Sequence, residues 1–90
     1  MIEQYNKLVE QEDRLLEQIE TVEKCMDAIY SFTFKHEEDL NQATVTKLLV
    51  MLQSAQNEYR MELIHLRLNK MIFAYRLNSW NKTSSDLTEK

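Results

Sequence analysis

Only a few side chains in this 90-residue chain have the types and spacing needed for shared chemistry. His36, Glu37, Glu38 and Asp39 follow one another in the sequence, and imidazole and carboxylate groups are common metal ligands. The run lacks the two histidines, four residues apart, with which a helix binds catalytic zinc. We interpret it as a solvated charged run near a helix end and expect no metal site.

Glu12 and Glu23 are the other pair that could act together, because both interrupt columns of apolar residues. On one helix their eleven-residue separation corresponds to about 16 Å, which is too far for joint acid–base catalysis. We interpret each as an edge residue or as an ion-pair partner for a base on a second helix. Register setting by a polar residue is a further alternative.

The remaining reactive side chains suggest no catalytic site. A phosphate-cradling loop needs glycine, and the chain has none. The single cysteine, Cys25, cannot form an internal disulfide and is expected to be a small buried apolar residue. His65 lies on a polar flank and has no marked companion. We therefore expect no catalytic residues, no cofactor and no enzyme activity.

The elements that carry these residues are predicted to be long helices. The chain has neither glycine nor proline, although average proteins contain about 7% and 5%. Glycine allows positive φ in turns and proline ends helices, so few turns are expected. A chain of this length builds only a marginal core by itself, and association with another chain is expected.

Apolar residues recur every seven positions from residue 2 to about 34, which predicts a first helix over 2–34. Three columns together make a broad apolar face. On the other side, Glu10–Arg14 and Glu20–Lys24 have the favourable order for ion pairs along a helix. The columns contain Ile2, Val9, Leu16 and Tyr30; Tyr5, Ile19 and Met26; and Leu8, Leu15, Val22 and Ile29.

The pattern breaks from Ser31, and we predict a connection over 35–43. Phe32 and Phe34 are expected to plug the open end of the helix pair, and Asn41 or Thr44 to cap the next helix. A second helix is predicted over 44–80, on an unbroken seven-residue column. That column is Val45, Leu52, Tyr59, Leu66, Phe73 and Trp80, beside Leu49, Gln56, Leu63, Lys70 and Leu77.

The predicted fold is therefore all-α: an antiparallel hairpin of two long helices in a single domain over residues 1–80. Residues 81–90 are polar and predict a flexible tail. Net charge supports the hairpin, because residues 1–40 carry eleven acids and four bases, net −7. Residues 41–90 carry four acids and seven bases, net +3, and the opposite signs attract.

The second helix shows a further apolar stripe, on the side away from its heptad column. A helix that is apolar on two sides must be covered on two sides, so these residues are the candidate partner-binding site. At ~100° per residue they cluster roughly 120–220° from Tyr59. They are Met61, Ile64, Leu68, Met71, Ile72 and Tyr75.

This stripe predicts a protein partner. Two hairpins packing through their second helices would form a four-helix bundle, and the alternative is a helix of another protein. We expect a homodimer or a hetero-oligomer. Nucleic acid is not expected to bind, because the scattered bases of the second half make a poor phosphate track. A polar N-terminus, the lack of a membrane-length apolar run and a free cysteine indicate the cytoplasm.

Two non-catalytic functions fit these expectations. The first is a small adaptor or chaperone that keeps a helical partner soluble, because size, acidity and topology resemble the helical-hairpin chaperones of secretion and flagellar export systems. The alternative is a structural subunit of a larger helical complex, such as a replication-type assembly. Glu58–Leu77 is similar to the long helix of GINS replication-complex subunits, which carries charged residues followed by an end like Tyr75-Arg76-Leu77.

Overall fold

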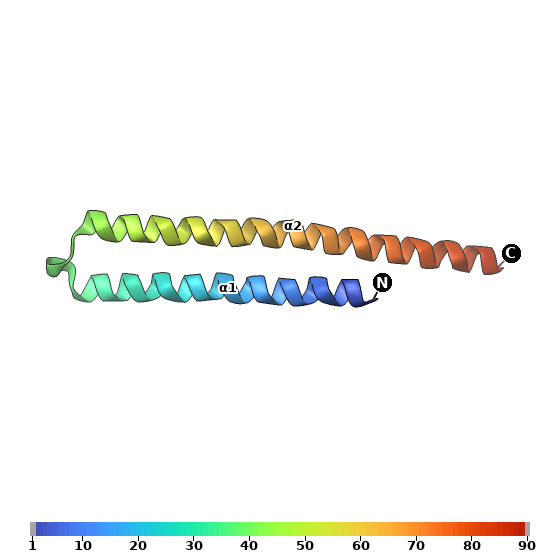
Figure 1. Ribbon diagram of the computed structural model, residues 1–90, viewed down its shortest axis with the longest axis horizontal. Coiled ribbons are helices and arrows are strands. Elements are labelled where there is room, and N and C mark those ends of the chain that lie inside the picture. Colours follow the sequence, from blue (N-terminus) through green and yellow to red (C-terminus); the bar gives the residue numbers. More distant parts are fainter. Residues whose placement is uncertain (1, 90) are drawn as a thin grey trace.

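The protein is a hairpin of two long antiparallel helices (Figure 1). The computed structural model describes the backbone of residues 2–89 and the side chains of residues 2–78. Helix α1 spans Ile2–Lys35, the short 3-10 helix η1 spans Glu37–Asp39, and α2 spans Gln42–Glu89. The molecule is 77 Å long and 16 Å across, and the part that the structure describes contains no strand. The predicted all-α hairpin is confirmed.

The connection is shorter than the sequence predicts. Helix α1 continues through Phe32 and Phe34 to Lys35, where the His36 N–H donates to the carbonyls of Phe32 (3.0 Å) and Thr33 (3.3 Å). Helix α2 begins at Gln42 because Asn41 caps it: the Asn41 side-chain oxygen accepts from the Thr44 N–H at 3.0 Å. Of the two capping candidates, Asn41 is the residue used.

Helix α2 continues to Glu89, across the segment 81–90 for which the sequence predicts a flexible tail. The side chains of that segment lie outside the described residues, and so does the side chain of Trp80 at the end of the heptad column. The tail therefore stays a prediction.

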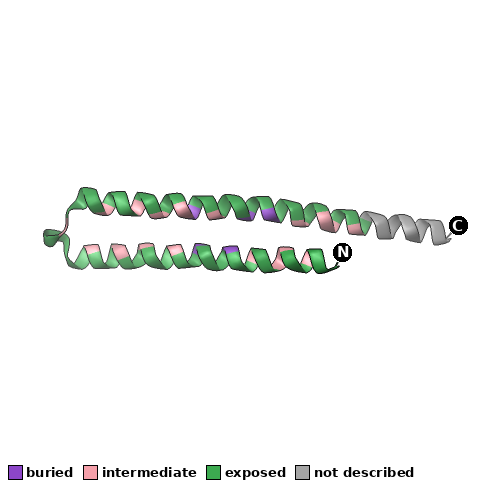
Figure 2. Ribbon diagram, viewed as in Figure 1, coloured by how far each residue is buried: buried purple, intermediate pink, exposed green. Residues whose placement is uncertain are grey.

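Two columns from each helix form the contact between α1 and α2, and we call this contact the seam. Its most buried apolar residues are Leu15 and Ile19 of α1 with Leu63 and Leu66 of α2. Figure 2 shows the buried positions on the facing sides of the two helices. The heptad column of α2 lies in the seam, as its period predicts. Its described members, half-buried or buried, are Val45, Leu52, Tyr59, Leu66 and Phe73.

The face that α1 uses is narrower than predicted. The column that contains Ile2, Leu16 and Tyr30 lies beside the seam, where these residues are 74%, 40% and 55% exposed. One neighbouring helix covers only two adjacent columns of its partner. A third column could be covered only by a further helix.

Three cross-helix contacts define the register. The Tyr5 ring stacks on Phe73 with centroids 6.2 Å apart, and Glu12 contacts Arg67. Nearer the connection, Glu23 pairs with Arg60 at 3.2 Å. Both glutamates are therefore ion-pair partners of bases on the second helix, as one of the sequence interpretations expects.

Gln56 is the one buried polar side chain among the described residues, at 4% exposure. It takes a seam position on α2, one heptad before Leu63. Its amide nitrogen has no hydrogen-bond partner. A buried donor without a partner lowers stability, so the seam has a weak layer at this point.

Two predictions about α1 are wrong. Phe32 and Phe34 lie beside the connection and are 56% and 85% exposed. They therefore do not cover the end of the helix pair, although the sequence predicts that they do. With the helix continuing to Lys35, Thr33 takes the seam position and each phenylalanine is turned about 100° away from it. Cys25 is exposed rather than buried, for the same angular reason.

No helix in the described part of the chain combines the length and apolar character needed to cross a membrane.

Candidate protein-binding surface

The six apolar residues that the sequence singles out on α2 all lie on its outer side, away from α1. We call them the outer stripe. Their spacing of three and four residues keeps them on one face of a straight helix. Their exposed fractions are Met61 71%, Ile64 67%, Leu68 52%, Met71 69%, Ile72 41% and Tyr75 73%.

The contrast with the seam is sharp at neighbouring positions. Leu63 is 7% exposed and Ile64, the next residue, is 67% exposed. Leu66 and Leu68 differ in the same way, at 8% and 52%. One segment of α2 therefore has one apolar side covered by α1 and a second apolar side without cover in the hairpin.

The outer stripe begins at Met61 because polar residues interrupt the same face before it. Val50 and Met51 are apolar and exposed, at 57% and 60%. Ser54, Asn57 and Glu58 follow them on the outer side of the helix. The continuous apolar surface is therefore limited to the half of α2 that faces the N-terminal half of α1.

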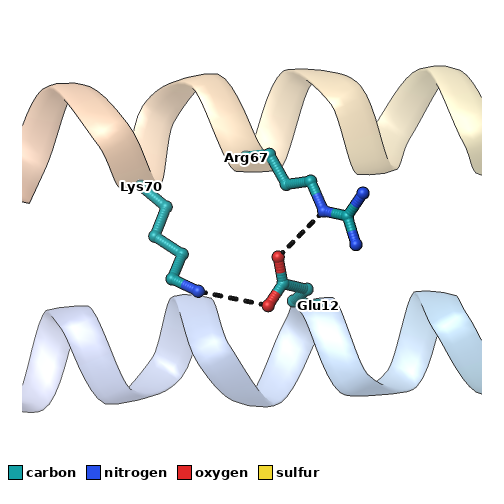
Figure 3. A network of polar contacts seen from close by, with 3 residues as sticks. All are labelled: Glu12, Arg67 and Lys70. Atoms are coloured by element: carbon teal, nitrogen blue, oxygen red, sulfur yellow. Dashed lines mark hydrogen bonds and ion pairs between the residues drawn. The ribbon is translucent and has the colours of Figure 1, made fainter.

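Ion pairs with α1 neutralise one flank of the outer stripe (Figure 3). The Glu12 carboxylate accepts from Arg67 Nε at 3.0 Å and from Lys70 Nζ at 3.2 Å. Arg60 pairs with Glu23 one heptad further along. Hydrogen bonds from Arg67 and then Lys70 hold the pKa of Glu12 below its ordinary value of 4.5. The Glu12 side chain is only 15% exposed, which reduces screening of these pairs by solvent.

The opposite flank is polar and open. A shallow groove of about 460 Å³ follows the two helices there, with Gln11, Arg14, Glu62, His65 and Asn69 among its lining residues. Leu8, Leu15 and Leu66 of the seam also line the groove, but it is too open to enclose a small molecule. This flank fits a polar rim around the outer stripe.

The charged run His36–Asp39, the sequence candidate for a metal site, is exposed. His36 lies against the Phe32 ring, with centroids 4.5 Å apart, and no three His, Cys, Asp or Glu side chains in this part of the chain are placed to hold a metal ion. The sequence predictions of no catalytic, cofactor or metal site stay predictions.

Sequence reasoning missed a second exposed apolar region, at the connected end. A groove of about 440 Å³ is lined there by Tyr30, Phe34, Val45 and Leu49, among others. The heptad count could have located it, because Thr33, and not Phe34, continues the seam column of Tyr5, Ile19 and Met26.

No protein-family model, curated protein or solved structure matches this chain. Function must therefore be inferred from the residues and the geometry of the hairpin.

Proposed function

We propose that this chain is a non-catalytic protein–protein interaction module that binds a helical segment of a protein through the outer stripe. The observation that carries the proposal is a helix with two apolar sides. Leu63 and Leu66 are covered by α1, whereas all six outer-stripe residues remain 41–73% exposed. Monomers rarely expose a contiguous apolar patch of several hundred Å² without a binding function.

The shape and composition of the stripe favour a helix as its partner. Its residues form a straight row on a convex helix surface, against which another helix can pack side by side. Met61 and Met71 are flexible side chains that adapt to different neighbours. Tyr75, at 73% exposure, combines an apolar ring with a polar hydroxyl, as residues important for binding often do.

In the cell, this module would act in the cytoplasm as an adaptor or a chaperone that covers the apolar side of a partner helix. The size and topology shared with helical-hairpin export chaperones support this role by architectural analogy only. The alternative function is that of a structural subunit, which uses the outer stripe to bind permanently within a larger helical complex. Exchange of the bound partner separates the two, because an adaptor releases it and a structural subunit does not.

Site-specific photo-crosslinking in the native host tests the proposal. A photoreactive residue replaces Leu68 in the outer stripe, and in a matched variant it replaces Glu17 on the exposed side of α1. We expect crosslinks to a helical segment of a protein from position 68 and few from position 17. Equal crosslinking at both positions, or none at position 68, would overturn the proposal.

A further inference from the structure

We propose that the first occupant of the outer stripe is the outer stripe of a second copy of this chain, packed antiparallel. This inference rests on the proposed function, because it names a partner for the same surface. It adds an orientation, a centre near Leu68 and a specific pair of charges across the interface.

The area is sufficient for a stable dimer. Weighted by their exposed fractions, the six residues present on the order of 700 Å². A stable protein–protein interface buries about 800 Å² on each partner. The outer stripe and its rim therefore reach that size when they meet a surface equally long and equally apolar, and a second outer stripe is such a surface.

The spacing of the stripe suits pairing with itself. Met61, Ile64, Leu68, Met71 and Tyr75 alternate steps of three and four residues, which is the pattern of a two-stranded coiled-coil seam. A twofold axis near Leu68 places the same row on both sides of the interface, as a symmetric dimer requires.

Charges beside the stripe select the antiparallel orientation. Glu58 and Arg76 are eighteen residues apart, which is about five full turns, so they lie on the same flank at opposite ends of the stripe. Their midpoint lies next to Leu68. An antiparallel pair centred there brings Glu58 of each copy to Arg76 of the other. In a parallel pair, the flank that carries Glu58 and Arg76 would lie on opposite sides of the interface in the two copies, so these charges would not meet.

Both charges are available for this contact. Among the described side chains, neither Glu58 nor Arg76 takes part in an ion pair within the hairpin. On the other flank, Arg60 and Arg67 are paired with Glu23 and Glu12. Those pairs reduce the repulsion that two basic flanks would otherwise exert on each other. The helices of such a dimer lie in a row, α1 outermost on each side, because the outer stripe faces away from α1.

The first test is self-association of the purified chain, measured by sedimentation equilibrium at tens of micromolar. We expect the wild-type chain to be a dimer. Leu68→Glu places a charge in both halves of the interface and should weaken association at least about a hundred-fold. Phe32→Glu, at a 56% exposed apolar residue of α1, lies away from the α2–α2 interface and should change self-association by no more than about two-fold. Circular dichroism should show both variants helical.

The second test is a charge exchange that reports orientation. Glu58→Arg and Arg76→Glu each create two like-charge contacts in an antiparallel homodimer and should each weaken self-association by about three- to ten-fold. Mixing the two variants makes both contacts attractive again. The mixture should therefore form a heterodimer close to wild-type strength, and high salt should reduce the differences.

These outcomes separate the two proposals. A monomeric wild-type chain, or two charge variants that do not recover on mixing, would overturn the antiparallel dimer. If the photo-crosslinks from position 68 to another protein persist in that case, the interaction module stands without the second copy. If they are also absent, both proposals fail.

Discussion

Replacing the buried amide of Gln56 by an apolar side chain should make the hairpin more stable. Gln56 is 4% exposed and its amide nitrogen has no partner. An unsatisfied buried donor costs about 1–3 kcal/mol, and a leucine there adds apolar burial to a layer of the seam. We expect Gln56→Leu to raise the free energy of unfolding by about 2 kcal/mol. For a domain of this size that corresponds to a rise in Tm of about 10 °C.

Thermal and urea unfolding followed by circular dichroism measures the change. The background for every variant is Leu68→Glu, which keeps association from contributing to the unfolding free energy. Gln53→Leu is the matched control, because Gln53 is exposed and donates to Asn57 at 3.2 Å. It should change stability by less than about 0.5 kcal/mol. An unchanged or lower stability of Gln56→Leu would refute the argument and show that the amide finds a partner in solution.

Three further predictions concern the hairpin itself. Glu12→Gln removes a carboxylate that accepts from two bases and should cost about 1–2 kcal/mol by urea unfolding. Folding lowers the pKa of Glu12 below its ordinary value of 4.5. The wild-type chain should therefore have its full excess in free energy of unfolding over this variant above pH 4.5. That excess should be lost as the pH falls through the folded-state pKa. Leu63→Ala should lower the free energy of unfolding by about 2–4 kcal/mol, and the neighbouring Ile64→Ala should lower it by less than about 1 kcal/mol. In a self-association assay the order should be reversed, with Ile64→Ala having the larger effect. Asn41→Ala should cost about 1 kcal/mol, and amide exchange should then increase in the first turn of α2.

The period of seven was enough to predict the two helices and one side of the seam. Residues from Val45 to Phe73 recur without a break, and a straight helix must place such a column on one side. The same angular rule separates Leu63 from Ile64, so the sequence was also enough to assign the outer stripe. The sequence did not identify the partner of the outer stripe, because an apolar face predicts that something covers it and not which molecule does so.

The predictions that were wrong concern burial that depends on the number of neighbouring helices. Leu16 and Tyr30 are apolar and correctly spaced, but a single partner helix has room for only two columns. Phe34 was expected to be buried because it is large and aromatic. Helix α1 continues past it, and its angle from the seam then decides its exposure. Hydrophobicity alone could not locate the seam, whereas the unbroken column of Leu8, Leu15 and Val22 could.

The position of Gln56 has a consequence for how the hairpin opens. Leu15, Ile19, Leu63 and Leu66 all lie on the side of this layer that is far from the connection. Between Gln56 and the connection, seam residues such as Ile29 and Leu49 are only half-buried. Local opening requires the least free energy where few apolar contacts must be broken. Backbone amides near the connected end should therefore exchange with solvent faster than those around Leu63. The connection then keeps the two helices close together while the far half maintains their alignment.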